Sequence, residues 1–191
     1  MTNQTTFLPG RRIAVLGTSG CGKTYVAKRL AEILGVTYIC SDAIFWGPDW
    51  TMTPPDERLA AYDRATSCEA WTFDGNVDGL SDTKGALILG RADTLIWLDL
   101  PRWRVFTQVL RRTIRRAWTK EPMWHNNSES WRMSFFSRDS ILLWSMQTYS
   151  MRKKKYGELF KDPAHAHLKK LRLTGRKQIN AWLASLGQVI A

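Results

Sequence analysis

The octapeptide at 17–24 leaves this chain few possible folds. It reads Gly17-Thr18-Ser19-Gly20-Cys21-Gly22-Lys23-Thr24, a complete G-x-x-x-x-G-K-[ST] string between an apolar run at 12–16 and a helical pattern at 23–34. Glycines let successive backbone N–H groups face one anion at the positive end of the following helix. The Lys23 ammonium then reaches the β- and γ-phosphates, and the Thr24 hydroxyl is a ligand for Mg²⁺. We therefore expect residues 17–24 to bind ATP or a similar triphosphate together with Mg²⁺.

The rest of the chain alternates short apolar runs with helical patterns, which is typical of an α/β fold with a parallel sheet. We expect one domain over residues 1–191, with a loop at 45–55 and a polar, mobile, lid-like excursion at about 119–140. The predicted strands lie at 12–16, 36–40, 71–74, 94–98 and 168–173. The predicted helices lie at 23–34, 56–70, 79–89, 101–118, 141–160 and 176–186.

The helix expected at 101–118 is amphipathic and rich in arginine. Its spacing predicts one apolar stripe, made of Trp103, Phe106, Leu110, Ile114 and Ala117. A second stripe is cationic and consists of Arg104, Arg111 and Arg115, with Arg112 and Arg116 beside it and no acidic residue between 104 and 116. We interpret four of these residues as a charge clamp for a phosphoryl group, with Arg132 and Arg138 of the excursion as partners: Arg111, Arg112, Arg115 and Arg116. The basic run at 152–155 is instead interpreted as solvated surface.

Charge is divided unevenly along the chain. Residues 1–101 carry 9 Lys+Arg and 12 Asp+Glu, a balance of −3, whereas residues 102–191 carry 19 and 5, a balance of +14. Because the second half is so basic, we expect it to bind phosphate esters, nucleic acid or an acidic surface. The tryptophans of this half are interpreted mainly as core residues, with base stacking as the alternative. The apolar and charged fractions, 44% and 24%, exclude a disordered chain.

Nothing in the sequence indicates export or a membrane span. No apolar run is long enough to cross a bilayer, and the N-terminal residues lack the apolar segment of a secretory signal. Three cysteines without metal-site spacing indicate reduced thiols. We therefore expect a cytoplasmic protein with no membrane partner.

Two carboxylates follow predicted strands, where open parallel sheets carry their functional groups. Asp74 is a candidate magnesium residue, and Asp42 is a candidate for binding or deprotonating an acceptor hydroxyl. The structural alternative for each is a turn residue or a helix cap. Asp99 is equally compatible with a helix cap and with a metal contact.

Motifs of other nucleotide-binding proteins are missing from the chain. It has no Asn-Lys-x-Asp guanine-recognition string and no Leu-Ser-Gly-Gly element of transport ATPases. A small domain with a basic excursion favours phosphoryl transfer, in which cations neutralise the moving phosphoryl group. The predicted catalytic residues are Lys23, Asp42, Arg111, Arg112 and Arg115.

Four segments together carry a family likeness: 17–24, Asp42–Trp46 (DAIFW), Trp71–Asn76 (WTFDGN) and Arg91–Arg102 (RADTLIWLDLPR). They resemble the DNA topology modulation (FlaR-like) proteins, which are related to adenylate kinases among the P-loop kinases. The resemblance implies a three-layer P-loop NTPase fold with strand order 2-3-1-4-5. It also implies ATP as donor, an acceptor-binding region after strand two and a helical lid-like insertion after strand four.

The same resemblance places Arg176, after strand five, where the adenine base packs; a plain helix-start turn is the alternative. The sequence departs from the adenylate kinase pattern at one place that concerns the acceptor. Adenylate kinases carry Asp-Gly-Phe-Pro-Arg after strand three, whereas this chain has Asp74-Gly75-Asn76, and Arg91 is the candidate replacement for the missing arginine. We expect a kinase whose acceptor is a small molecule, nucleoside or nucleotide other than AMP. The alternative is an ATP-regulated nucleic-acid-binding protein.

Overall fold

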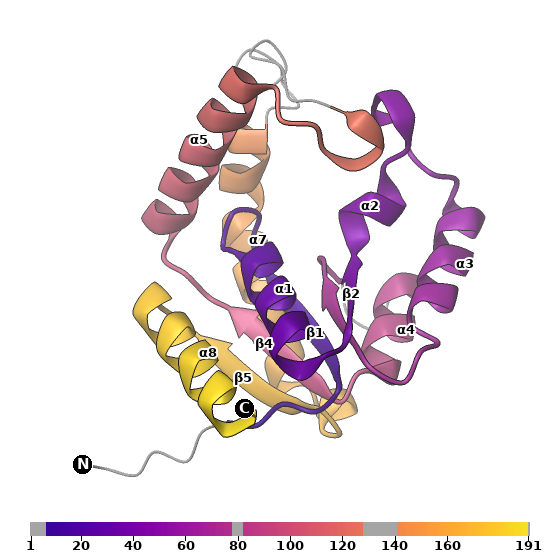
Figure 1. Cartoon of the computed structure of the whole chain (residues 1–191), viewed down its shortest axis with the longest axis vertical. Coiled ribbons are helices and arrows are strands. Elements are labelled where there is room, and N and C mark those ends of the chain that lie inside the picture. The colour runs from indigo at the N-terminus through magenta and orange to yellow at the C-terminus, as the bar shows by residue number, and fades with distance from the viewer. Residues whose placement is uncertain (1–6, 78–81, 128–140, 191) are drawn as a thin grey trace.

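Five parallel strands form the centre of the structure, a computed structural model that describes residues 7–77, 82–127 and 141–190 (Figure 1). The strands lie in the order β2-β3-β1-β4-β5, and every neighbouring pair is parallel. Their bounds are β1 Arg12–Gly17, β2 Thr37–Cys40, β3 Trp71–Asp74, β4 Thr94–Leu98 and β5 Lys169–Leu173. The predicted fold class and strand order are confirmed.

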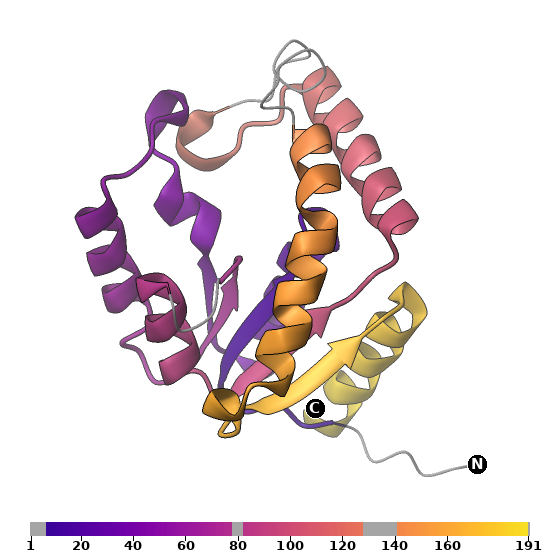
Figure 2. The ribbon, with the colours of Figure 1, turned by 180° about the vertical axis from the view of Figure 1, so that it is seen from behind.

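Helices cover both faces of the sheet and make three layers. One face carries α1 (Lys23–Leu34) and α8 (Arg176–Ile190); the other carries α3 (Pro55–Ala65), α4 (Thr83–Arg91) and α7 (Ile141–Lys161), as Figure 2 shows from behind. The long helix α5 (Arg102–Thr119) follows β4 and packs against α7. The shorter elements are α2 Ser41–Phe45, η1 Pro48–Trp50, η2 Trp124–Asn126 and η3 Pro163–His165.

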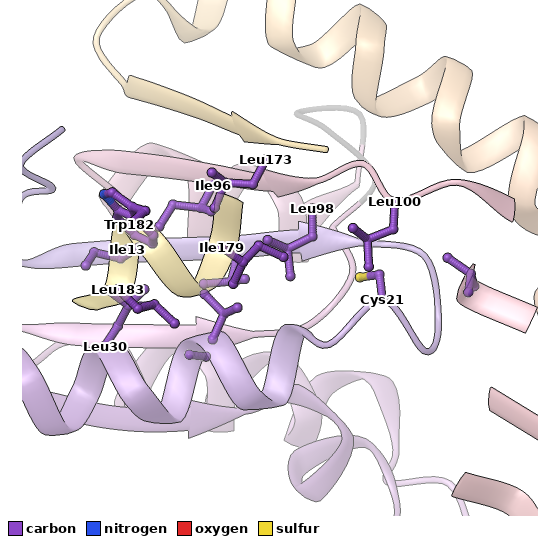
Figure 3. Packing of buried hydrophobic residues seen from close by; sticks show 14 of the residues in the cluster. Ile13, Cys21, Leu30, Ile96, Leu98, Leu100, Leu173, Ile179, Trp182 and Leu183 are labelled. Atoms are coloured by element: carbon purple, nitrogen blue, oxygen red, sulfur yellow. The ribbon is translucent and has the colours of Figure 1, made fainter. Parts of the chain in front are cut away.

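The core has two apolar clusters, one on each side of the sheet. Alternate residues of a strand point to opposite faces, so Ile13 joins Trp182 and Leu183 of α8 on one side (Figure 3). Ala14, the next residue, joins Phe73 on the other side. Burial on both faces holds the central strands rigidly, and their carboxyl ends therefore form a stable edge for a site.

Local hydrogen bonding ends α3 earlier than the pattern predicts. The helix ends at Ala65, so the predicted end at 70 is wrong. The Thr66 hydroxyl donates to Tyr62 O (2.8 Å) and the Ser67 hydroxyl to Arg64 O (2.8 Å), both within the last turn. Side chains that bond to the backbone in this way compete with helix propagation. The segment after β2 begins with α2, a short helix for which the sequence pattern gave no prediction, and the predicted loop at 45–55 follows it.

The buried face of α5 is not the predicted apolar stripe. Its buried residues are Val105, Val109, Thr113 and Ala117, whereas Trp103 of the predicted stripe is 63% exposed. The reason is that α5 lies against the phosphate-binding loop and α7 instead of the sheet, where small side chains permit close approach. Of the predicted stripe, only Ala117 is buried.

The tryptophans of the basic half divide between core and surface. Trp182 is buried in the core, whereas Trp103 and Trp118 are exposed and Trp144 is at the border of exposure. Trp131 lies outside the described residues. The interpretation of these side chains as core residues is therefore right only in part. In the described part of the chain, every helix is too short or too polar to span a bilayer.

Candidate active site

The glycine-rich loop between β1 and α1 folds as a concave cradle. Gly20 and Gly22 have φ angles of 83° and 97°, in the left-handed region that side chains disfavour. The Lys23 ammonium lies across this loop and donates to Gly17 O (2.9 Å) and Thr18 O (3.2 Å). The loop therefore presents backbone N–H groups, a helix N-terminus and one cation around a single point, which is the geometry of a polyphosphate site.

Two later helices pack directly on this loop. A Cβ at Gly20 would collide with the Val109 side chain of α5. On α7, the Ser145 hydroxyl donates to Ser19 O (3.2 Å) and the Tyr149 hydroxyl to Leu100 O (2.9 Å). The basic half of the chain is thereby brought against the phosphate-binding loop.

The two predicted carboxylates lie at the carboxyl edge of the sheet. Cys40 at the end of β2 pairs in register with Asp74 at the end of β3. Asp42 follows Cys40 by two residues and therefore lies just past the same edge of the sheet. Asp74 is only 6% exposed and accepts from the Tyr38 hydroxyl (3.0 Å). Asp42 as a whole residue is exposed, but protein atoms surround its carboxylate, which lies near enough to Asp74 for that charge to act on it. The structure therefore brings Asp42 near both Asp74 and Lys23, whose charges act on it.

The charges around Asp42 act on one another. Protein atoms packed around the carboxylate raise the pKa of Asp42 above the ordinary 3.8. The ammonium of Lys23 lowers this pKa and the carboxylate of Asp74 raises it. Arg112 and Lys84 are also near enough to lower it. Asp42 is thus a carboxylate whose proton affinity is enhanced while cations surround it, a combination suited to a general base.

The residues present fit Mg²⁺. The described residues contain no group of three or more His, Cys, Asp or Glu side chains that could enclose a metal ion. Mg²⁺ needs no such enclosure, because it keeps several waters and is bound through one or two protein oxygens plus substrate phosphates. The Thr24 hydroxyl at the start of α1 and the Asp74 carboxylate supply oxygens of that kind.

The arginines of α5 are divided between two faces. Arg112 and Arg116 are half-buried, and the charge of Arg112 acts on Asp42. Arg111 and Arg115 lie on the exposed face, and Arg115 pairs with Glu121 (2.8 Å). The predicted clamp residues are therefore not all brought together. Arg132 and Arg138 lie outside the described residues.

A polar chain that sequence reasoning missed connects α7 to the phosphate-binding loop. With its amide nitrogen toward the acceptors, Asn76 donates to Gly17 O (2.8 Å) and Tyr156 Oη (3.0 Å). The Asn76 oxygen accepts from Arg152 (3.2 Å), which also donates to Tyr156 Oη (3.2 Å). The interpretation of the 152–155 run as surface is wrong for Arg152, whose guanidinium lies on the site side. The Asp74-Gly75-Asn76 string was the available signal.

Asp99 is held by two cations of the basic half. Its buried carboxylate accepts from Arg172 Nε (3.0 Å) and lies 3.2 Å from Lys153 Nζ. Of the two predicted alternatives, a helix cap and a metal contact, the described contacts support neither. The ion pairs instead tie the end of β4 to β5 and α7.

A separate pocket lies beside the phosphate-binding loop, between α1 and α8. Its lining includes Tyr25, Gln108, Arg176, Ile179 and Asn180. Arg176 therefore lines a pocket next to the phosphate-binding loop, and its role at the adenine base stays a prediction. Arg91, the proposed replacement for the missing acceptor arginine, does not reach the site. It donates to Asp63 O (2.8 Å) at the opposite edge of the sheet, because α4 ends there before β4 begins.

The first part of the predicted excursion lies against the segment after β2. Asn127 donates to Gly47 O (2.8 Å) and accepts from Trp50 N (3.1 Å). His125 Nε2 is 3.3 Å from Ala43 O. This segment therefore lies against the connection that follows Asp42. Residues 128–140 of the predicted excursion lie outside the described residues.

Comparison with known proteins identifies the fold. No family model and no curated protein sequence matches the chain. Among solved structures, the chain is similar to shikimate kinase from Acinetobacter baumannii in complex with shikimate. The identity is 16% over 97% of this chain and 94% of that one, with a TM-score of 0.55. It is also similar to a gluconokinase from Sinorhizobium meliloti 1021, with 17% identity over 95% and 94% of the two chains and a TM-score of 0.51. The chain has the fold of these P-loop kinases.

Proposed function

We propose that this protein is a phosphotransferase that moves the γ-phosphoryl group of ATP to a hydroxylated small molecule or nucleotide. One observation carries the proposal: Lys23, Asp42, Asp74 and Arg112 converge at the carboxyl edge of the sheet. A switch or binding protein needs the phosphate cradle but not a carboxylate that lies beside it among cations. The fold shared with a shikimate kinase and a gluconokinase supports the proposal. The resemblance to FlaR-like proteins and the cytoplasmic location remain predictions.

In the proposed reaction, the loop and Lys23 hold the β- and γ-phosphates of ATP. The acceptor oxygen attacks the γ-phosphorus, the bond to the β–γ bridging oxygen breaks, and ADP leaves. Asp42 takes the proton from the attacking hydroxyl. Mg²⁺, held through Thr24 and Asp74, supplies further charge neutralisation when bound. Positioning and electrostatics supply most of the rate in phosphoryl transfer, and every residue named here acts in one of these ways.

The cationic clamp that we propose comes from the inward faces of two helices. Arg112 and Arg116 belong to α5, and Arg152 belongs to α7. The contacts of Arg152 with Asn76 and Tyr156 orient its guanidinium toward the loop, because bonds to two fixed partners restrict its rotamers. The segment around Asn127 would exclude water that otherwise hydrolyses ATP.

Neighbouring arginines test which face of α5 acts in catalysis. Arg112→Ala should lower kcat by about 10²- to 10³-fold, because it removes a cation positioned near the transferred group. Arg111→Ala, the matched control on the exposed face, should change kcat less than about twofold. Steady-state ADP release measures both. Equal losses in the two variants would contradict this assignment of faces.

The pocket between α1 and α8 should determine nucleotide affinity without affecting chemistry. Arg176→Ala should raise the dissociation constant of ATP by about tenfold, since a stacked or hydrogen-bonded base loses one partner. The kcat at saturating ATP should stay unchanged. Calorimetric titration of a nonhydrolysable ATP analogue measures the affinity, with Lys177→Ala as the exposed control. A fall in kcat at saturation would instead place Arg176 in the reaction.

Acceptor-dependent ADP release tests the proposed function. Release from Mg·ATP is measured with nucleosides, nucleoside monophosphates, sugars, sugar acids, and single-stranded and duplex DNA. A kinase gives a large stimulation by one small molecule. Stimulation by DNA alone, or tight ATP binding with no acceptor effect, would contradict the kinase and favour a binding function.

A further inference from the structure

Tyr38 of β2 lies beside Asp74 and has no role in the chemistry described so far. Its hydroxyl donates to Asp74 Oδ2 (3.0 Å). Asp74 is buried, and within residues 7–77, 82–127 and 141–190 it forms no ion pair. A hydroxyl orients a carboxylate without cancelling its charge, whereas a lysine or arginine in the same place would pair with it. The negative charge of Asp74 can therefore still be used by a bound cation.

The register of the sheet explains why this tyrosine reaches Asp74. In the parallel β2–β3 ladder, Tyr38 pairs with Thr72 and Cys40 pairs with Asp74. Side chains two residues apart on a strand point to the same face, so all four of these residues share one face of the sheet. The Tyr38 side chain is long enough to extend from its own position to the carboxyl end of β3. Its hydroxyl is thereby brought to the edge that carries the site.

The face that Tyr38 shares with Asp74 is the one that α1 covers. The Thr72 hydroxyl donates to Ala27 O of α1 (3.0 Å), and the Lys28 ammonium lies 5.4 Å from the ring centroid of Tyr38. Thr24 lies four residues before Lys28, which places it one turn away on the same side of α1. The tyrosine ring is therefore packed against the helix whose first turn carries the proposed magnesium hydroxyl (Figure 1).

We infer that Tyr38 is a positioning residue of the magnesium site, whose hydroxyl holds one oxygen of Asp74 and leaves the other to Mg²⁺. This inference rests on the proposed function, in which Thr24 and Asp74 hold the metal. Partners that fix the orientation of a metal-binding carboxylate contribute about 10- to 100-fold to metal affinity. Tyr38→Phe removes only the hydroxyl, and it should lower the affinity for Mg²⁺ by that factor.

Metal binding measured without turnover tests the inference. With protein in excess, nearly all of a nonhydrolysable ATP analogue is bound, and Mn²⁺, which has the same ligand preferences as Mg²⁺, is titrated and followed by electron paramagnetic resonance. We expect Tyr38→Phe to raise the dissociation constant of Mn²⁺ by about 10- to 100-fold. Tyr62→Phe is the matched control: it removes a buried hydroxyl that lies 2.9 Å from Ser41 Oγ, and it should leave the constant unchanged. Unchanged Mn²⁺ affinity in Tyr38→Phe would overturn the inference.

A double-variant cycle tests whether Tyr38 acts through Asp74. Asp74→Asn alone should weaken Mn²⁺ binding, and Tyr38→Phe added to it should weaken binding no further, because no carboxylate is left to orient. Two losses that added in full would overturn the inference, since Tyr38 would then affect the metal by another route. Each variant is also titrated with the analogue in the absence of metal. Unchanged affinity there shows that the phosphate-binding loop is folded and that the loss concerns the metal.

The ADP-release assay separates this inference from the kinase on which it rests. Acceptor-stimulated release by the original chain, with unchanged Mn²⁺ affinity in Tyr38→Phe, would overturn the inference and leave the kinase standing. An Asp74→Asn protein that bound Mn²⁺ as tightly as the original chain would overturn the metal assignment and this inference with it. The expected losses of Mn²⁺ affinity, without ADP release for any acceptor, would instead contradict the proposed function alone.

Discussion

Replacing Lys23 by alanine should abolish acceptor-stimulated turnover, with kcat/KM for ATP lowered by at least about 10³-fold. The ammonium lies across the phosphate cradle, bonded to Gly17 O and Thr18 O at 2.9 and 3.2 Å. No water molecule can replace its charge opposite a triphosphate. ADP release measures the loss, and calorimetric titration with a nonhydrolysable analogue separates binding from chemistry.

Two comparisons make the Lys23 result interpretable. Arg29→Ala removes an exposed cation of the same helix, which pairs with Glu32, and should retain nearly full activity. Loss of the two lysine hydrogen bonds should lower the free energy of unfolding by about 1–3 kcal/mol. A folded Lys23→Ala protein that still turned over ATP at a tenth of the original rate would refute the assigned site.

The Asp42→Asn substitution should lower kcat by about 10²- to 10⁴-fold, because an amide cannot take the acceptor proton. ATP affinity should change little, since Thr24 and Asp74, rather than Asp42, are assigned to the metal. Asp49→Asn is the matched control: Asp49 is exposed on the same connection, and asparagine tolerates its φ of 52°. A full-rate Asp42→Asn enzyme would rule out this base.

The pH profile gives an independent reading of the same carboxylate. A general base acts when deprotonated, so the rate should fall as pH falls through the pKa of Asp42. Because surrounding protein raises that pKa above 3.8, the acid limb should lie at a higher pH than for an ordinary aspartate. The limb should vanish from the residual activity of Asp42→Asn. An acid limb that persisted in this variant would assign the titration to another group.

The Asp42→Asn substitution should raise the stability of the protein although it lowers the rate. A raised pKa in the folded state means that folding disfavours the carboxylate, and stability is lost as pH rises through the folded pKa. At neutral pH, Asp42→Asn removes this cost, so the Tm of the variant should equal or exceed that of the original chain. Such a gain on removing a catalytic group is typical of functional sites.

Much of the architecture could be predicted because it depends on local patterns. Each of these patterns spans fewer than twenty residues: a buried strand, the G-x-x-x-x-G-K-[ST] string and the periodicity of a helix. The bounds of β4 were predicted to the residue, since Thr94 to Leu98 is an unbroken apolar run buried on both faces. The end of α3 was not, because Thr66 and Ser67 bond to the backbone of the preceding turn.

The candidate site likewise contains residues that local patterns predict and residues that only helix packing places. Residues 17–24, Asp42 and Asp74 lie near strand ends, and the register of a parallel sheet brings strand ends together. The choice between Arg111 and Arg112 depends on which face of α5 meets the loop. Periodicity favoured the apolar stripe that begins at Trp103 as the buried face of α5. In the structure α5 is turned so that Val109 packs on Gly20 instead.

The sequence by itself determined the strand–loop–helix cradle for phosphate, the parallel sheet and the two carboxylates at its edge. Only the tertiary structure brought Arg152 against Asn76 and placed the Lys84 ammonium over the ring of Tyr62. Those residues are separated by 76 positions in the first case and by 22 in the second. Contacts over such separations depend on how helices pack across the sheet, and packing is decided by side-chain shape in three dimensions, which a linear pattern does not record.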